Sequence, residues 1–138
     1  MNIKRILPYA LAPVGLFLLN CILDFGLGLY EPYPWIDIPM HLFGGAAIAV
    51  FVFGMYKELL RSKQATPMPL WVELCCVVGG VMIAAVVWEF FEYLVDLQFQ
   101  TRWQPSVDDT IFDLFNGMLG GTLTGLFFLL EQKKRSST

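Results

Sequence analysis

Four long runs of apolar residues divide the chain, and short polar segments separate them. The runs cover residues 6–29, 38–56, 70–95 and 107–130, and each is close to or longer than the roughly 20 residues that cross a hydrocarbon core about 30 Å thick. Their apolar residues are continuous rather than confined to the stripe of a soluble amphipathic helix. Backbone amides in lipid must be bonded within their own segment, and the chain is too short for a closed barrel, so each run predicts a helix.

The composition agrees with a membrane protein. The 138 residues are 57% hydrophobic and have a mean hydropathy of +0.60, which leaves too little polar surface for a water-soluble domain of this size. Lys4 and Arg5 precede the first run as in a secretory signal, but no small-residue cleavage site follows, so this run is also expected to remain as a helix. We therefore expect one all-α domain over residues 1–138, a four-helix transmembrane bundle in the lipid bilayer.

The basic residues predict the orientation of this bundle. With four crossings, eight of the nine lysines and arginines fall on the side of the two termini, and Arg102 falls on the other. Cytoplasmic loops carry the excess of Lys and Arg in inserted proteins, so we expect cytoplasmic N- and C-termini in a multi-pass protein of the cell inner membrane. The basic tail at residues 133–135 is long enough only for a topology anchor or anionic-lipid contact, and no motif indicates nucleic-acid binding.

The acidic residues have the opposite distribution. Nine of the twelve Asp and Glu residues fall on the side away from the termini, where Arg102 is the one basic residue. Several lie inside the apolar runs: at 1.5 Å per residue, Asp113 is roughly 9 Å into the fourth run, and Glu89 is at a similar depth in the third. A carboxylate within the membrane costs at least about 2.5 kcal/mol on insertion scales, so we expect these groups to face inward and to share a partner.

Helical spacing places these polar groups on common faces. Asp37 and His41 are four residues apart, and Glu89 and Glu92 are three apart, separations that put side chains on one face of a helix. A bound cation, protons or a water-filled vestibule could each neutralise such groups. Carboxylates, an imidazole and an amide oxygen suit a divalent ion such as Mn, Fe, Zn, Mg or Ca. The predicted ligands of a divalent metal ion are Asp37, His41, Glu89, Asp113 and Asn116.

Several of these features also have a purely structural interpretation. Asp37 precedes a proline in a first helical turn and fits a helix cap. Ser106, with an acid three residues later at Asp109, fits a capping box. The deeper acids, the histidine and Asn116 could equally serve as hydrogen-bonding groups between helices.

Glycines mark two further helix faces. Gly117, Gly121 and Gly125 recur every four residues, and Gly44 and Gly45 follow the histidine of the second run. Small residues at this spacing let helix backbones approach closely. These faces predict tight packing, either within the bundle or in a homodimer.

Three motifs stand in order along the chain: Asp37-Ile-Pro-Met-His41-Leu-Phe-Gly44, Trp88-Glu89-Phe-Phe-Glu92-Tyr93 and Asp109-Thr-Ile-Phe-Asp113-Leu-Phe-Asn116-Gly117-Met-Leu-Gly120-Gly121. Together they resemble the YjdF-like family of bacterial inner membrane proteins and, more loosely, the VanZ-like proteins. The resemblance implies a multi-pass membrane protein, and the link of VanZ-like proteins to glycopeptide tolerance implies a place in the cell envelope. Ile38-Pro39 stands where the family commonly has an Asp-Lys pair. The biochemistry of these families is largely unknown, so the resemblance supplies no catalytic residue.

Three functions fit a polar layer of this kind. The first is metal-assisted hydrolysis or transfer on a lipid-linked or other envelope substrate, with Glu92 as the catalytic base. The second is proton or cation transport, which requires polar groups in the other half of the bundle as well; Glu73 and Asn20 are the candidates there. The third is a structural or accessory subunit in which the polar layer only sets the helix register. The sequence leaves open whether the protein is an enzyme.

Overall fold

A computed structural model describes residues 2–136 and consists of four long helices joined by short loops. The helices are α1 (Ile3–Cys21), α2 (Asp37–Arg61), α3 (Leu70–Phe99) and α4 (Val107–Ser136). A π-helical turn, η1 (Ile22–Gly26), continues α1, and a 3-10 turn, η2 (Pro34–Ile36), leads into α2. Four helical segments are long and apolar enough to cross a membrane. The predicted all-α transmembrane bundle is confirmed.

The helix limits differ by a few residues from those predicted. Three helices run further, to Arg61, Phe99 and Ser136, because a helix can continue into the headgroup region where polar side chains are solvated. The first helical segment is shifted towards the N-terminus: it begins at Ile3 and stops at Gly26. Gly28 has a φ of +60°, a left-handed conformation that ends helices and that glycine adopts without strain.

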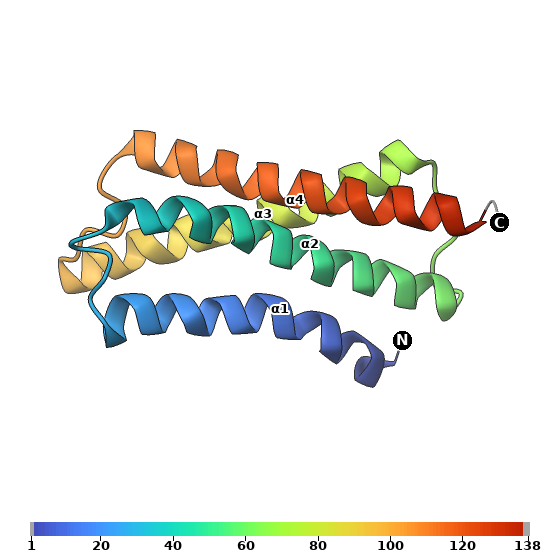
Figure 1. Ribbon diagram of the computed structural model, residues 1–138, viewed down its shortest axis with the longest axis horizontal. Helices are drawn as coiled ribbons and strands as arrows, with labels where there is room; N and C mark the ends of the chain where they lie inside the picture. The colour runs from blue at the N-terminus through green and yellow to red at the C-terminus, as the bar shows by residue number, and fades with distance from the viewer. Residues whose placement is uncertain (1, 137–138) are drawn as a thin grey trace.

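Consecutive helices run antiparallel, and both ends of the described chain lie at the same end of the bundle (Figure 1). α2 packs most extensively against α4, and α3 packs against both. Among the described residues, no Cα atom of α1 lies within 8 Å of a Cα atom of α3 or α4, so α1 is attached through α2. The bundle is therefore a three-helix core with α1 along one side.

The glycine faces bring helix backbones together inside the chain. A Cβ atom on Gly45 would overlap the carbonyl oxygen of Gly117, and one on Gly120 would overlap the carbonyl oxygen of Leu42. On the α3 side, a Cβ atom on Gly121 would approach a methyl group of Val81 to 2.7 Å. The predicted close packing is thus present within one chain, while a homodimer through these faces stays a prediction.

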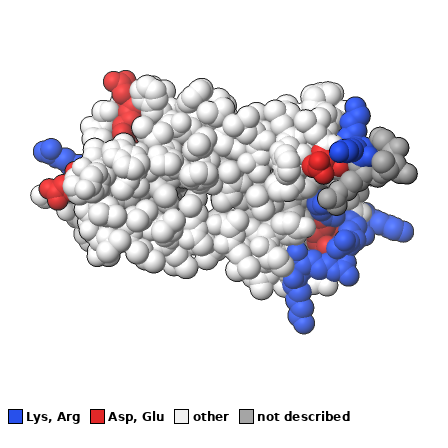
Figure 2. All heavy atoms as spheres, viewed as in Figure 1, with Lys and Arg blue, Asp and Glu red and all other residues white. Residues whose placement is uncertain are grey.

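Charge and apolar packing divide the bundle along its length. Lysine and arginine side chains gather at the end that carries the termini, and a wide uncharged band covers the middle (Figure 2). Inside that band, Ala49, Val77 and Val81 form an almost fully buried core. The half of the bundle away from the termini contains the buried acids Glu89, Glu92 and Asp113.

Candidate metal centre

His41 lies between two groups of acidic side chains near the end of the bundle opposite the termini. Its Nε2 atom is 3.3 Å from Asp37 Oδ1 and 3.8 Å from Asp113 Oδ1. One candidate ligand atom from each of Asp37, His41 and Asp113 lies within 4.8 Å of the other two, and the same holds for His41, Glu89 and Glu92. Helices α2, α3 and α4 therefore bring together four of the five predicted metal ligands, with the predicted base beside them.

Asp37 takes part in this cluster rather than capping its helix. The N-cap of α2 is Ile36, and no side chain accepts a hydrogen bond from the first turn there. Ser106, by contrast, accepts a hydrogen bond from the backbone N–H of Asp109 at 3.2 Å through its hydroxyl oxygen. The capping interpretation is therefore confirmed for Ser106 and wrong for Asp37. The carboxylate of Asp37 instead contacts His41, which follows one turn later on the same helix.

Two buried carboxylate oxygens in the cluster lack a hydrogen bond. Glu89 and Asp113 are 5% and 3% exposed, and among the described residues neither Glu89 Oε1 nor Asp113 Oδ2 has a hydrogen-bond partner. Over the same residues, no lysine or arginine lies within 4 Å of either carboxylate. Buried polar atoms are nearly always bonded, so these two oxygens are an exception that distinguishes the cluster.

Glu92 is held by a neighbour on its own helix. The indole N–H of Trp88 donates a hydrogen bond of 2.7 Å to Glu92 Oε1, and Glu92 is almost fully buried. The sequence-based prediction did not include this bond. The separation of four residues between Trp88 and Glu92 was the available signal, since side chains so spaced are neighbours on a helix.

The loop between α3 and α4 positions a further polar group. Asp96 accepts hydrogen bonds from the Thr101 hydroxyl at 2.6 Å and from the backbone N–H groups of Trp103 and Gln104 at 2.8 and 2.9 Å. The Gln104 side chain then donates to Glu89 Oε2 at 3.0 Å. Gln104 was not among the predicted site residues, because no local spacing relates a loop amide to a carboxylate fifteen residues earlier.

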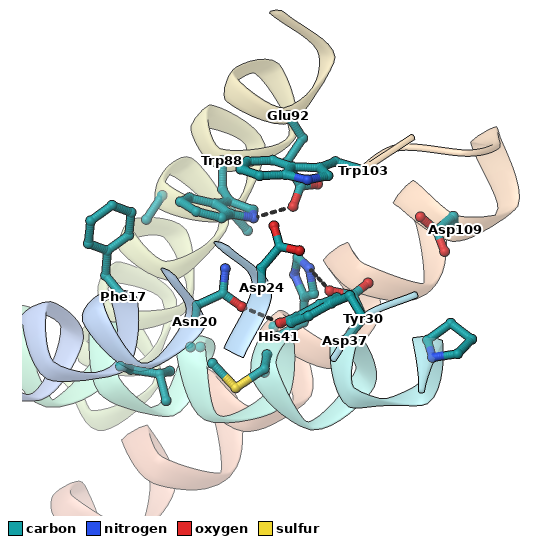
Figure 3. Close-up of a pocket in the computed structure, with 18 of the residues that line it drawn as sticks. Phe17, Asn20, Asp24, Tyr30, Asp37, His41, Trp88, Glu92, Trp103 and Asp109 are labelled. Carbon is teal, nitrogen blue, oxygen red and sulfur yellow. Dashed lines mark hydrogen bonds and ion pairs between the residues drawn. The ribbon is translucent and has the colours of Figure 1, made fainter. Parts of the chain in front are cut away.

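A cavity of about 670 Å³ adjoins the cluster, and Asp37, His41 and Glu92 lie on its wall (Figure 3). Tyr30 lies beside Asp37 and His41 in this cavity, and its hydroxyl donates a hydrogen bond to Asn20 Oδ1 (Figure 3). Burial, followed by the charge of Asp37, raises the pKa of Tyr30 above its usual range, so the phenol keeps its proton and acts as a donor. Asn20 therefore belongs to this end of the bundle, and its sequence-based assignment to the other half was wrong.

Asn116 has a different position from the other predicted ligands. Its side-chain amide donates a hydrogen bond of 2.8 Å to the carbonyl oxygen of Phe112, one turn earlier on α4. Amide groups inside membrane helices often bond to their own backbone in this way. Its role as a ligand stays a prediction.

The fold and the cluster together define a multi-pass, four-helix membrane protein with a histidine-centred acidic site at one end. Within that class, the family described as "Predicted membrane protein (DUF2238)" matches residues 7–134, and the chain belongs to this family. The YjdF-like resemblance is of this type, whereas the looser VanZ-like resemblance finds no support in the comparisons. No curated protein and no solved structure matches the chain.

Proposed function

We propose that the protein is an inner-membrane protein of the cell envelope that binds a divalent cation at the end of the bundle away from its cytoplasmic termini. Asp37, His41 and Asp113 supply the ligands on one side, and Glu89 supplies another on the side of α3. The observation that carries this proposal is the pair of buried, unbonded oxygens on Glu89 and Asp113. A cation would bond to such oxygens and cancel the repulsion among the clustered carboxylates.

The donor set favours a transition metal. Carboxylate oxygens alone suit Mg²⁺ or Ca²⁺, whereas one imidazole among carboxylates suits Mn²⁺, Fe²⁺ or Zn²⁺. Helical bundles build such carboxylate–histidine sites from inward-facing side chains on neighbouring helices. On binding, His41 and Asp37 would exchange their mutual contact of 3.3 Å for bonds to the ion.

The reaction that we assign to this site is metal-assisted hydrolysis or transfer on an envelope or lipid-linked substrate. A bound divalent cation polarises the substrate and lowers the pKa of a coordinated nucleophile. Glu92 is the proposed general base: Trp88 fixes its Oε1 atom, and Oε2 would accept the proton of the attacking nucleophile.

The two other functions that the sequence leaves open have less support. Conduction requires a polar path, but Ala49, Val77 and Val81 fill the middle of the bundle. At the end of the termini, Glu73 is already bonded to the Tyr56 hydroxyl at 2.5 Å and to the Met68 N–H at 3.4 Å. A purely structural polar layer would leave the two unbonded oxygens uncompensated, which costs about 1–3 kcal/mol per group.

Metal analysis of the purified protein tests the proposal, with a purification tag that contains no histidine. We expect a stoichiometric transition metal in the wild type, lost in His41→Ala and in Asp113→Asn. Asp108→Asn is the matched control, because Asp108 is an exposed acid near the same end of α4. Equal metal content in all four proteins would contradict the proposal. A wild type without metal whose proton flux in liposomes is abolished by Glu89→Gln would replace it by transport, and absence of both would leave a structural role.

A further inference from the structure

The cavity beside the proposed cation site changes from apolar to polar along the bundle. The side chains nearer the middle are apolar and come from three helices: Leu16 and Phe17 on α1, Ile48 on α2, and Val81, Ala84 and Ala85 on α3. Towards the end of the bundle the lining is polar and includes Asn20, Tyr30, His41, Glu92 and Asp109. A volume of about 670 Å³ lies in the range of small-molecule sites. The two halves together match an amphiphile, with its tail towards the middle of the bilayer.

One wall of the cavity is closed by side chains alone. The cavity is lined by both α1 and α3, yet in the described residues these helices have no Cα atoms within 8 Å of each other. The rings of Phe17 and Trp88 meet edge to face across this gap at 5.9 Å, and Phe17 is 47% exposed. The half-exposed Phe17 ring can turn aside without disturbing the bond of Trp88 to Glu92 or the close glycine packing of α2 and α4. A ligand can therefore reach the cavity sideways, from the bilayer.

The charges around the polar half favour an anionic headgroup once a cation is present. Without a cation, the carboxylates of Asp37, Glu92 and Asp109 would repel an anion. A divalent ion bound beside His41 reverses the local sign. Arg102, the one described lysine or arginine at this end, lines the same cavity. Phosphate oxygens bind both divalent cations and guanidinium groups well.

We infer that the cavity holds a membrane lipid with a phosphate-containing headgroup, which enters between α1 and α3 and places its phosphate between the cation and Arg102. This inference rests on the proposed cation site and names the class of its substrate. The occupant is a lipid rather than free phosphate, because the apolar half would otherwise stay unfilled at membrane depth, and because the gap beside Phe17 faces the hydrocarbon region.

Native mass spectrometry of the whole protein in a non-ionic maltoside detergent tests this inference. The protein is loaded with Mn²⁺ and titrated with dodecyl phosphate, and inorganic phosphate is titrated in parallel. We expect one bound dodecyl phosphate per chain, at least about tenfold weaker binding after removal of Mn²⁺, and much weaker binding of inorganic phosphate.

Two variants separate the headgroup from the tail. A Cβ atom on Gly44 would lie at an ordinary 3.9 Å from Leu16, so Gly44→Leu fills the apolar half without a backbone clash and should weaken binding about tenfold. Gly79→Leu is its control, because Gly79 is an exposed helical glycine with no atom within 4 Å of its Cβ position. Arg102→Gln should weaken binding about two- to fivefold, as expected for an exposed ion pair.

Each outcome decides between the two proposals. Metal-dependent binding that Gly44→Leu weakens and Gly79→Leu does not would support the inference. Two results in a wild type that holds Mn²⁺ would overturn the inference and leave the cation site standing. One is that it binds dodecyl phosphate no better than inorganic phosphate, and the other is that Gly44→Leu binds dodecyl phosphate as tightly as the wild type does. A wild type that holds no metal would remove the cation site, and this inference with it.

Discussion

One carboxylate oxygen of Asp96 accepts a hydrogen bond from the backbone N–H of Gln104 at 2.9 Å, and the side chain of the same glutamine donates to Glu89 at 3.0 Å. Asp96, near the end of α3, thereby fixes a loop that in turn supports the buried Glu89, about two helical turns deeper. The loop between α3 and α4 is thus part of the construction of the site and more than a connection between two helices.

Asp96→Ala should loosen this loop. The substitution removes the acceptor for three hydrogen bonds, so we expect a loss of about 1–3 kcal/mol in the free energy of unfolding and faster hydrogen exchange at residues 101–104. Exchange followed by mass spectrometry in detergent measures the loop directly. Glu31→Ala, which removes an exposed acid of another loop at the same end, serves as the control. Unchanged exchange at residues 101–104 would show that other contacts hold the loop.

Gly45→Ala should be strongly destabilising. A methyl group at this position would overlap the carbonyl oxygen of Gly117, so α2 and α4 must separate, at a cost of about 1–3 kcal/mol for overpacking. Gly79→Ala has open space around the added methyl group and should be neutral or stabilising by up to about 1 kcal/mol, since alanine favours helix more than glycine does. Thermal unfolding in detergent compares the two. A drop of similar size in both variants would contradict the observed backbone approach.

Tyr56→Phe should destabilise the end of the bundle that carries the termini and leave the metal content unchanged. Its hydroxyl donates to the buried Glu73 at 2.5 Å, and losing one such bond typically costs about 1 kcal/mol. Tyr93→Phe removes a hydroxyl from a half-exposed side chain and is expected to be nearly silent. Metal loss in Tyr56→Phe would mean that the two ends of the bundle are coupled, which the apolar layer between them argues against.

The predicted orientation can be tested with reporter fusions. A green fluorescent protein fused after the last residue should fluoresce, and alkaline phosphatase at the same point should be inactive, because the basic end is expected to stay in the cytoplasm. Alkaline phosphatase fused after Arg102 should be active. The reverse pattern would place the acidic cavity on the cytoplasmic side and would exclude an outward-facing site.

The sequence predicted the helices and half of the site for physical reasons that act locally. Continuous apolar runs of membrane-spanning length have few alternatives to a helix, and the spacing of Asp37 and His41 puts them on one face in any helix. The depth of Asp113 and Glu89 was likewise a matter of counting residues. These features depend only on the geometry of single segments.

The rest of the site depends on how the segments meet. The bond of Gln104 to Glu89 follows from the path of a loop, and the pairing of Tyr30 with Asn20 follows from the turn at Gly28 that brings the chain back towards α1. The separation of α1 from α3 was also not predictable, because hydropathy in lipid marks which helices insert and not which of them touch. The assignment of Asn20 to the other half was a separate error, because its position past the midpoint of the first run already indicates this end of the bundle.

The position of His41 between both acidic groups has a practical consequence, because the chain contains one histidine. Isotope labelling of that amino acid gives a protein with a single imidazole, whose nitrogen resonances arise from the candidate site without background from elsewhere. Titration with Mn²⁺ or Zn²⁺ can then be followed at one atom, by broadening or by a shift, in the intact protein within its lipid environment. The nitrogen spectrum of this one imidazole can therefore identify a cation that binds at the site before any substrate is known.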